Sequence, residues 1–136
     1  MEKILEVKDL HIHFNAFAGA VRAIRGVNFH LNKGETLAIV GESGSGKSVT
    51  AYSVMQILAG TGKITSGSIK FDGQELVGSG EKVMKTIRGN RISIIFQDPM
   101  TSLNPTYTIG RQLMEAILLH TGRNHEQARE RALEML

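Results

Sequence analysis

The octapeptide Gly41-Glu42-Ser43-Gly44-Ser45-Gly46-Lys47-Ser48 decides the fold of this chain. Glycines at its first and sixth positions, followed by Lys-Ser, form the pattern of a phosphate-binding loop. This pattern indicates a phosphate site when it lies between a strand and a helix. The preceding residues 36–40, Thr-Leu-Ala-Ile-Val, predict a short buried strand. After the loop, apolar residues recur at helical spacing, namely Ala51, Val54, Met55 and Leu58. The stretch therefore predicts a strand, a loop and a helix that bind a nucleoside triphosphate.

Each residue type in the loop has a task in holding phosphate. Gly41, Gly44 and Gly46 tolerate backbone angles that side chains forbid, so consecutive N–H groups can point at one phosphate chain. The helix that begins near Lys47 adds its own N–H groups and the positive end of its dipole. Lys47 supplies a charge at the β- and γ-phosphates, and the Ser48 hydroxyl is placed to bind Mg²⁺. The alternative is a flexible Gly/Ser connector that happens to precede a lysine.

Composition excludes several other classes of protein. The 136 residues are 41% hydrophobic and 21% charged, which is typical of a soluble domain. No run of about 18 apolar residues predicts a membrane helix, and the polar start is not a secretory signal. Cysteine is absent, which excludes disulfides and thiolate metal sites and fits the cytosol. A net charge of +3 with scattered bases and few aromatics argues against nucleic-acid binding.

The first 35 residues predict an antiparallel β layer. Three extended segments, Ile4–Phe14, Ala20–Ile24 and Val27–Leu31, are separated by the loop 15–19 and by a turn at Arg25-Gly26. Connections this short join antiparallel strands, because a parallel crossover needs a dozen or more residues.

Further elements follow the first helix. A hairpin over 68–76 turns at Asp72-Gly73, a short helix spans 81–88, and the apolar run 92–96 predicts a central strand of a parallel sheet. Thr108 caps a helix over 109–120, with Ile109, Leu113, Ala116 and Ile117 facing inward. A last amphipathic helix from Glu126 to Leu136 carries Ala128, Ala132, Met135 and Leu136 on one side and has no C-terminal cap, so the chain is expected to be the front part of a longer protein.

The placed motifs resemble those of a known family. Leu5 to Leu10 is similar to the opening strand of ABC transporter ATP-binding subunits, Gly41 to Ser48 to their Walker A loop, and Ile95 to Pro99 to their Q-loop. The run Phe96-Gln97-Asp98-Pro99-Met100-Thr101-Ser102-Leu103-Asn104-Pro105 resembles the oligopeptide and dipeptide importer branch, which also includes nickel importers. The resemblance implies an α/β P-loop NTPase fold. Its expected parts are an antiparallel layer (1–35), a nucleotide-binding core (36–107) and the start of a helical subdomain (108–136).

The resemblance also implies roles for individual residues. Phe14 matches the aromatic residue that stacks on adenine, and Phe17 is a nearby competitor for that role. Gln97 matches the residue that reaches toward Mg²⁺ and the attacking water, so Lys47 and Gln97 are the expected catalytic residues, and Ser48 and Gln97 the metal ligands. The expected ATP-binding residues are Phe14, Gly41, Glu42, Ser43, Gly44, Ser45, Gly46, Lys47, Ser48 and Val49.

The sequence departs from the family pattern at one position and lacks several motifs. Val49 stands where many members have threonine, but its N–H group remains available. The second signature loop, the Asp-Glu strand that activates water and the switch histidine are missing. His11 and His13 share one strand face without a third metal ligand. The 136 residues alone are therefore expected to bind ATP weakly and to hydrolyse almost none.

The resemblance implies an importer ATPase that uses Mg²⁺ and ATP to drive uptake of oligopeptides or dipeptides. Its expected partners are membrane subunits and a second ATP-binding subunit, identical or different, and its expected location is the cytoplasmic face of the cell membrane, as a peripheral protein. The alternatives are a soluble ABC-type ATP switch, a nickel importer ATPase and a small phosphate-loop kinase.

Overall fold

The computed structural model describes residues 2–17, 19–98 and 102–136 of the chain. It divides into two compact units, residues 1–84 and 85–136, with the boundary inside helix α2 (Glu81–Ile87). The expected divisions after residues 35 and 107 differ from this boundary and stay a prediction. Among the described residues, no helix is both long enough and apolar enough to cross a membrane.

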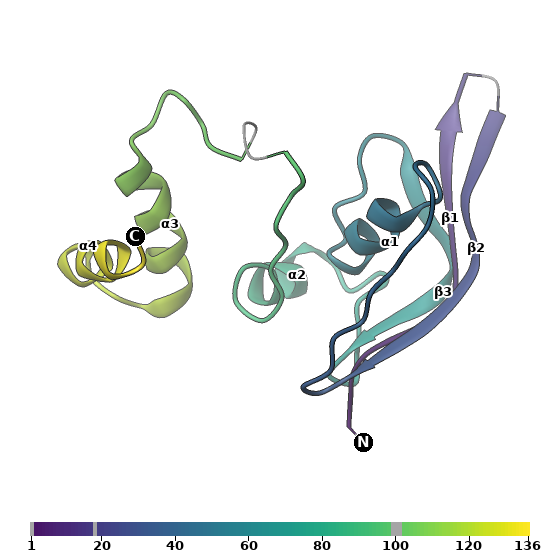
Figure 1. Cartoon of the computed structure of the whole chain (residues 1–136), viewed down its shortest axis with the longest axis horizontal. Helices are drawn as coiled ribbons and strands as arrows, with labels where there is room; N and C mark the ends of the chain where they lie inside the picture. The colour runs from purple at the N-terminus through teal and green to yellow at the C-terminus, as the bar shows by residue number, and fades with distance from the viewer. Residues whose placement is uncertain (1, 18, 99–101) are drawn as a thin grey trace. The chain divides into compact units, whose positions relative to one another are not determined.

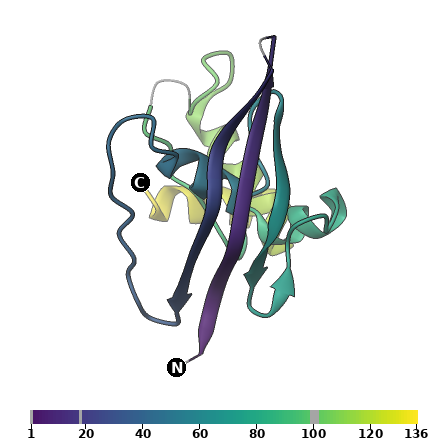
Figure 2. The same ribbon diagram turned by 90° about the vertical axis from the view of Figure 1, so that its right-hand side faces the viewer.

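A four-stranded antiparallel sheet organises the first unit. Its strands are β1 (Lys3–Ala16), β2 (Gly19–Asn32), β3 (Gly62–Phe71) and β4 (Gln74–Glu75), in the order β2-β1-β3-β4 (Figures 1 and 2). Because β1 is paired on both sides, its side chains include three that are almost fully buried, Val7, Leu10 and Ile12. The predicted antiparallel layer is confirmed, and β3 extends it beyond the first 35 residues.

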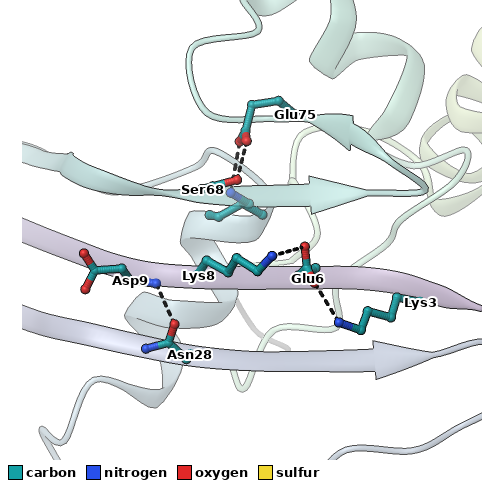
Figure 3. Close-up of polar contacts among 8 residues, drawn as sticks. Lys3, Glu6, Lys8, Asp9, Asn28, Ser68 and Glu75 are labelled. Carbon is teal, nitrogen blue, oxygen red and sulfur yellow. Dashed lines mark hydrogen bonds and ion pairs between the residues drawn. The ribbon is translucent and has the colours of Figure 1, made fainter.

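Strand β2 is one continuous strand, so the predicted turn at Arg25-Gly26 is wrong. Gly26 has the left-handed angle φ +76°, and Asp9 on the facing part of β1 has φ +44°. The pairing of β1 with β2 shifts register between Leu10 and His11, whose partners Val27 and Arg25 leave Gly26 as the extra residue on β2. The Asn28 side chain accepts a hydrogen bond from the Asp9 N–H at 2.9 Å (Figure 3). The glycine therefore makes a bulge that bends the strand without ending it.

Helix α1 (Lys47–Val54) follows the phosphate-binding loop and lies on one face of the sheet (Figure 1). The helix buries Thr50, Ser53 and Val54, whereas Ala51 is exposed, so its predicted inward position is wrong. The two hydroxyls can be buried because each donates to a helix carbonyl: Thr50 to Gly46 at 2.9 Å, and Ser53 to Thr50 at 2.6 Å. The buried face of the helix therefore holds two polar residues beside Val54 and Met55 of the apolar pattern.

The predicted buried strand at 36–40 and the predicted central strand at 92–96 do not form, and both predictions are wrong for the described chain. Residues 36–40 are irregular, and the side chain of Val40 is 87% exposed. In the run 92–96, Ile92 makes a single parallel bridge to Arg88, and Ile95 is 98% exposed. A strand needs a hydrogen-bonding neighbour, and neither run has a neighbouring strand within the described residues.

The described part of the second unit holds the end of α2 followed by α3 (Ile109–Thr121) and α4 (His125–Glu134). The Thr108 hydroxyl accepts from the Arg111 N–H, which confirms the predicted cap. Ala128 and Ala132 are buried as predicted, but Ile109 is 55% exposed. The predicted inward face of α3 is therefore only partly right, since Leu113 and Ile117 are half-buried while Ile109 and Ala116 are exposed.

Candidate phosphate-binding site

The loop 41–48 runs directly into the first turn of α1. Gly46 is the N-cap residue with φ +95°, and Gly44 has φ +80°. Both values lie in the left-handed region, which strongly favours glycine. Helix geometry leaves the N–H groups of Lys47, Ser48 and Val49 without a partner inside the helix. The chain thus presents main-chain donors at the positive end of a helix dipole, which is the arrangement that binds phosphate.

Besides backbone angle, close approach of neighbouring atoms is a reason for glycine in this loop, at positions 46 and 41. A Cβ atom at Gly46 would lie 2.5 Å from Cδ1 of Ile24 on β2. A Cβ atom at Gly41 would lie 2.6 Å from Oγ of Ser45, although Gly41 itself is not in the left-handed region. Gly41 therefore does not use the backbone freedom expected of it, and its missing side chain instead leaves room for Ser45.

Lys47 reaches back across its own loop. Its Nζ donates hydrogen bonds to the carbonyl oxygens of Gly41 and Glu42, both at 2.7 Å. An ammonium group has three N–H donors, so these two bonds leave one for a ligand. The side chain is half-buried, and the two bonds hold its charge beside the loop before any phosphate arrives.

The other residues predicted to bind the nucleotide or Mg²⁺ are exposed or half-buried. Ser48 is exposed on the first turn of α1, and the side chain of Val49 is half-buried. Gln97 is exposed in the second unit, so its grouping with Lys47 and Ser48 stays a prediction. Pro99 of the predicted Q-loop, and Met100 and Thr101 of the longer run 96–105, lie outside the described residues, as does position 18 in the predicted loop 15–19.

Phe14 and Phe17 occupy very different surroundings. Phe14 is half-buried on β1, opposite Val21 of β2 and Gly62 of β3. Phe17 follows the end of β1 and is fully exposed. Ile12, two residues before Phe14, pairs with Ile24, the residue beside Gly46. Because alternate residues of a strand share one face, Phe14 lies on the sheet face that carries the phosphate-binding loop.

Sequence reasoning missed the residues that support the loop from the sheet. Ala23 and Ile24 both approach Gly46, at 3.4 Å and 2.5 Å from the position that a Cβ atom would take. These residues lie far from the loop in sequence, and their apolar character is shared by many core residues. No local signal distinguishes them, so only the fold reveals their role.

The charged groups with the clearest partners lie on the strands. Hydrogen bonds from Lys3 and then from Lys8, at 2.8 and 3.0 Å, lower the pKa of Glu6 to about 2 (Figure 3). His11 contacts Asp9 at 3.0 Å, which places this histidine in an ion pair or hydrogen bond on the strand surface. The described residues contain no group of three or more His, Cys, Asp or Glu side chains arranged to hold a metal ion.

Comparison with known proteins identifies the family. The family model described as ABC transporter matches residues 24–136, which include the whole loop and helix α1. The chain belongs to the ABC transporter family. The loop 41–48 therefore lies within the part of the chain that the family model matches.

The relatives agree with this assignment. The chain is 54% identical over 135 residues to the oligopeptide transport ATP-binding protein OppD of Bacillus subtilis, covering 98% of this chain and 38% of OppD. It is 53% identical over 136 residues to the dipeptide transport ATP-binding protein DppD of Lactococcus lactis, covering 99% of this chain and 39% of DppD. The chain thus spans about two fifths of the length of these relatives.

Solved structures share the fold. The ATP-binding cassette MJ0796, as a dimer in a post-hydrolysis state bound to ADP and Pi, matches with a TM-score of 0.81 and 26% identity. The match covers 96% of this chain and 54% of MJ0796. The predicted ABC ATPase fold is confirmed.

Proposed function

We propose that this chain is part of the ATP-binding subunit of an ABC importer that takes up oligopeptides or dipeptides. The observation that carries the proposal is the closed loop around Lys47, whose ammonium group is held by two loop carbonyls at the start of α1. Relatives that are 54% and 53% identical bear the names of oligopeptide and dipeptide transport ATP-binding proteins, which supports the solute class.

The residues of the loop fit the phosphates of ATP. The N–H groups that follow Gly46 bind phosphate oxygens, and the third donor of Lys47 neutralises charge between the β- and γ-phosphates. Ser48 is exposed at the first turn of α1, where its hydroxyl is available as a ligand for Mg²⁺. When bound, Mg²⁺ would neutralise the charge that develops on the phosphates during hydrolysis.

Other parts of the chain serve the rest of the nucleotide and the transporter. Phe14 stacks on the adenine ring, and Gln97 senses the γ-phosphate and orients the attacking water. Membrane subunits and a second ATP-binding subunit complete the transporter, which places this protein at the cytoplasmic face of the cell membrane. The dimer of MJ0796 supports pairing of two ATP-binding subunits.

The test replaces the lysine in the full-length protein. We expect Lys47→Ala to weaken Mg·ATP binding by about tenfold or more, because a charge-assisted hydrogen bond contributes about 1.5–3 kcal/mol. ATP hydrolysis and peptide uptake should fall with it. Isothermal titration measures the affinity, and uptake of a labelled peptide into membrane vesicles measures transport.

The matched control is Lys82→Ala on α2, which should leave affinity and uptake unchanged. Unaltered ATP affinity in the Lys47→Ala variant would overturn the assignment of the loop. Uptake of nickel in place of peptide would show a nickel importer, and purification without membrane subunits would favour a soluble ATP switch.

A further inference from the structure

We propose that Gly62, by having no side chain, leaves the space in which the aromatic ring of Phe14 packs. In this way Gly62 determines the position of the purine-binding surface. The proposal rests on the function proposed above, in which Phe14 stacks on adenine. It assigns to Gly62 a positioning role, because this glycine has no side chain to contact the nucleotide.

The ring of Phe14 lies over the backbone of Gly62. The two residues face each other across the β1–β3 pairing. A Cβ atom built on Gly62 would be 2.6 Å from Cε1 of Phe14 and 3.0 Å from its Cζ. Real Cβ atoms do not approach other atoms so closely, so the ring occupies the space that any side chain at position 62 would need.

The backbone at Gly62 could accept a side chain if the ring were absent. Its φ lies outside the left-handed region, where an L-residue would be strained. Backbone angle therefore gives no reason for glycine here. The remaining reason is the Phe14 ring, together with the Ala59 carbonyl oxygen at 3.2 Å from the same Cβ position.

The backbone around Gly62 is tied down, so the ring is the part that must move. The Gly62 N–H donates to the Ala59 carbonyl at 3.1 Å. The Thr61 hydroxyl donates to the Asn15 carbonyl on β1 at 2.6 Å, which fastens the start of β3 beside Phe14. A methyl group at position 62 would contact the Phe14 ring, which can move, and the Ala59 carbonyl oxygen, which is held in place. The Phe14 ring would therefore be displaced from its position over Gly62.

The consequence is specific to the base of the nucleotide. Phe14 shares the sheet face of the phosphate-binding loop but is a separate structure on β1, so displacing the ring leaves the loop intact. Stacking on an aromatic ring stabilises the base and not the phosphate chain. Loss of part of that stacking should weaken ATP binding while binding of a phosphate chain without a base is unchanged.

The experiment compares Mg·ATP with Mg·tripolyphosphate in the full-length protein by isothermal titration. We expect Gly62→Ala to weaken ATP binding by about three- to tenfold and to leave tripolyphosphate binding unchanged. We expect Phe14→Ala to weaken ATP binding about tenfold, and the double variant to be no weaker than Phe14→Ala alone, because the ring is then already gone. The control Gly110→Ala, where nothing lies within 4 Å of the added Cβ, should match the wild type.

The outcomes separate this proposal from the function on which it rests. Three results would overturn the positioning role of Gly62. In the Gly62→Ala variant these are equal weakening of ATP and tripolyphosphate binding, or no weakening of either. The third is the same loss of ATP affinity from Gly62→Ala with and without the Phe14 ring. If Gly62→Ala fails to fold, recovery of folding in the Gly62→Ala/Phe14→Ala variant supports the proposal, and no recovery overturns it. Failure of the proposed function itself would appear separately, as ATP binding that is indifferent to Lys47→Ala.

Discussion

Both the backbone conformation and the packing at position 46 favour glycine. Gly46 joins the loop to α1 at φ +95°, and its missing side chain leaves room for Cδ1 of Ile24 at 2.5 Å from the Cβ position. We expect Gly46→Ala to cost about 1–2 kcal/mol from backbone strain alone, with a further cost from the clash. Thermal unfolding should show the loss of stability, and titration with Mg·ATP should show at least a tenfold loss of affinity as the loop shifts.

The companion variant Gly46→Ala/Ile24→Ala tests which effect dominates. Shortening Ile24 removes the clash but not the unfavourable φ, so ATP affinity should recover only in part. Full recovery would show that crowding alone requires the glycine. A Gly46→Ala variant with normal stability and normal affinity would contradict the described geometry of the loop.

Glu75 illustrates how one carboxylate organises a hairpin. Burial acts to raise its pKa, but hydrogen bonds from the Ser68 hydroxyl and from the N–H groups of Ile69 and Val77 outweigh it and lower the pKa. Figure 3 shows the bond between Ser68 and Glu75. A lowered pKa means that the ionised carboxylate stabilises the folded state above its ordinary pKa of 4.5, and that this stability is lost as the pH falls below that value.

We therefore expect Glu75→Gln to lower the free energy of unfolding by about 1 kcal/mol at pH 7. The difference from the wild type should shrink as the pH falls below 4.5 and through the lowered pKa of the folded protein, where the wild-type carboxyl becomes protonated too. Urea unfolding between pH 7 and pH 3 measures this. Glu130→Gln on the exposed surface of α4 is the control, and a difference that grows on acidification would contradict the assignment.

At the scale of single elements, the start of α4 is determined by a reciprocal cap. The Asn124 side chain accepts from the Gln127 N–H at 2.9 Å, and the Gln127 side chain accepts from the Asn124 N–H at 3.1 Å. We expect Asn124→Ala to destabilise the helix by about 1 kcal/mol, because the Gln127 N–H loses its acceptor and the reciprocal arrangement is broken. Faster hydrogen exchange at residues 125–128 would report this.

Asn124→Ser is the matched control for the cap. Serine keeps a short oxygen acceptor at the N-cap position, so exchange in α4 should stay close to that of the wild type. Exchange that is equally fast in the alanine and serine variants would show that the acceptor is not what stabilises the helix.

At the scale of the whole molecule, the two exposed apolar runs 36–40 and 92–96 stand out. Leu37, Val40 and Ile95 are 45%, 87% and 98% exposed, although their composition is that of buried strands. The relatives OppD and DppD are more than twice as long as the matched region. We expect both runs to pair within a larger sheet in the full-length protein.

Hydrogen exchange tests this expectation directly. Amides of 36–40 and 92–96 should exchange slowly in the full-length protein and quickly in the 136-residue chain, because hydrogen bonding within a sheet protects the N–H groups of a strand. Residues of β1, which is paired on both sides, serve as the internal reference and should be protected in both proteins. Fast exchange of both runs in the full-length protein would contradict the expectation.

The sequence by itself determined the features that depend on neighbouring residues. The phosphate-binding loop, the Asp72-Gly73 hairpin turn and the Thr108 cap all follow from a few adjacent residue types, because backbone angles and capping bonds are local. Resemblance to a family added the ABC ATPase fold, which the comparisons confirmed.

Only the tertiary structure decided the features that join distant parts of the chain. Ile24 packs on Gly46, Phe14 covers Gly62, and a bulge at Gly26 keeps β2 continuous where a turn was predicted. The apolar runs 36–40 and 92–96 are typical of strands but stay irregular here. The physical reason is the same in each case: packing and strand pairing depend on a partner, and no window of sequence contains the partner's position.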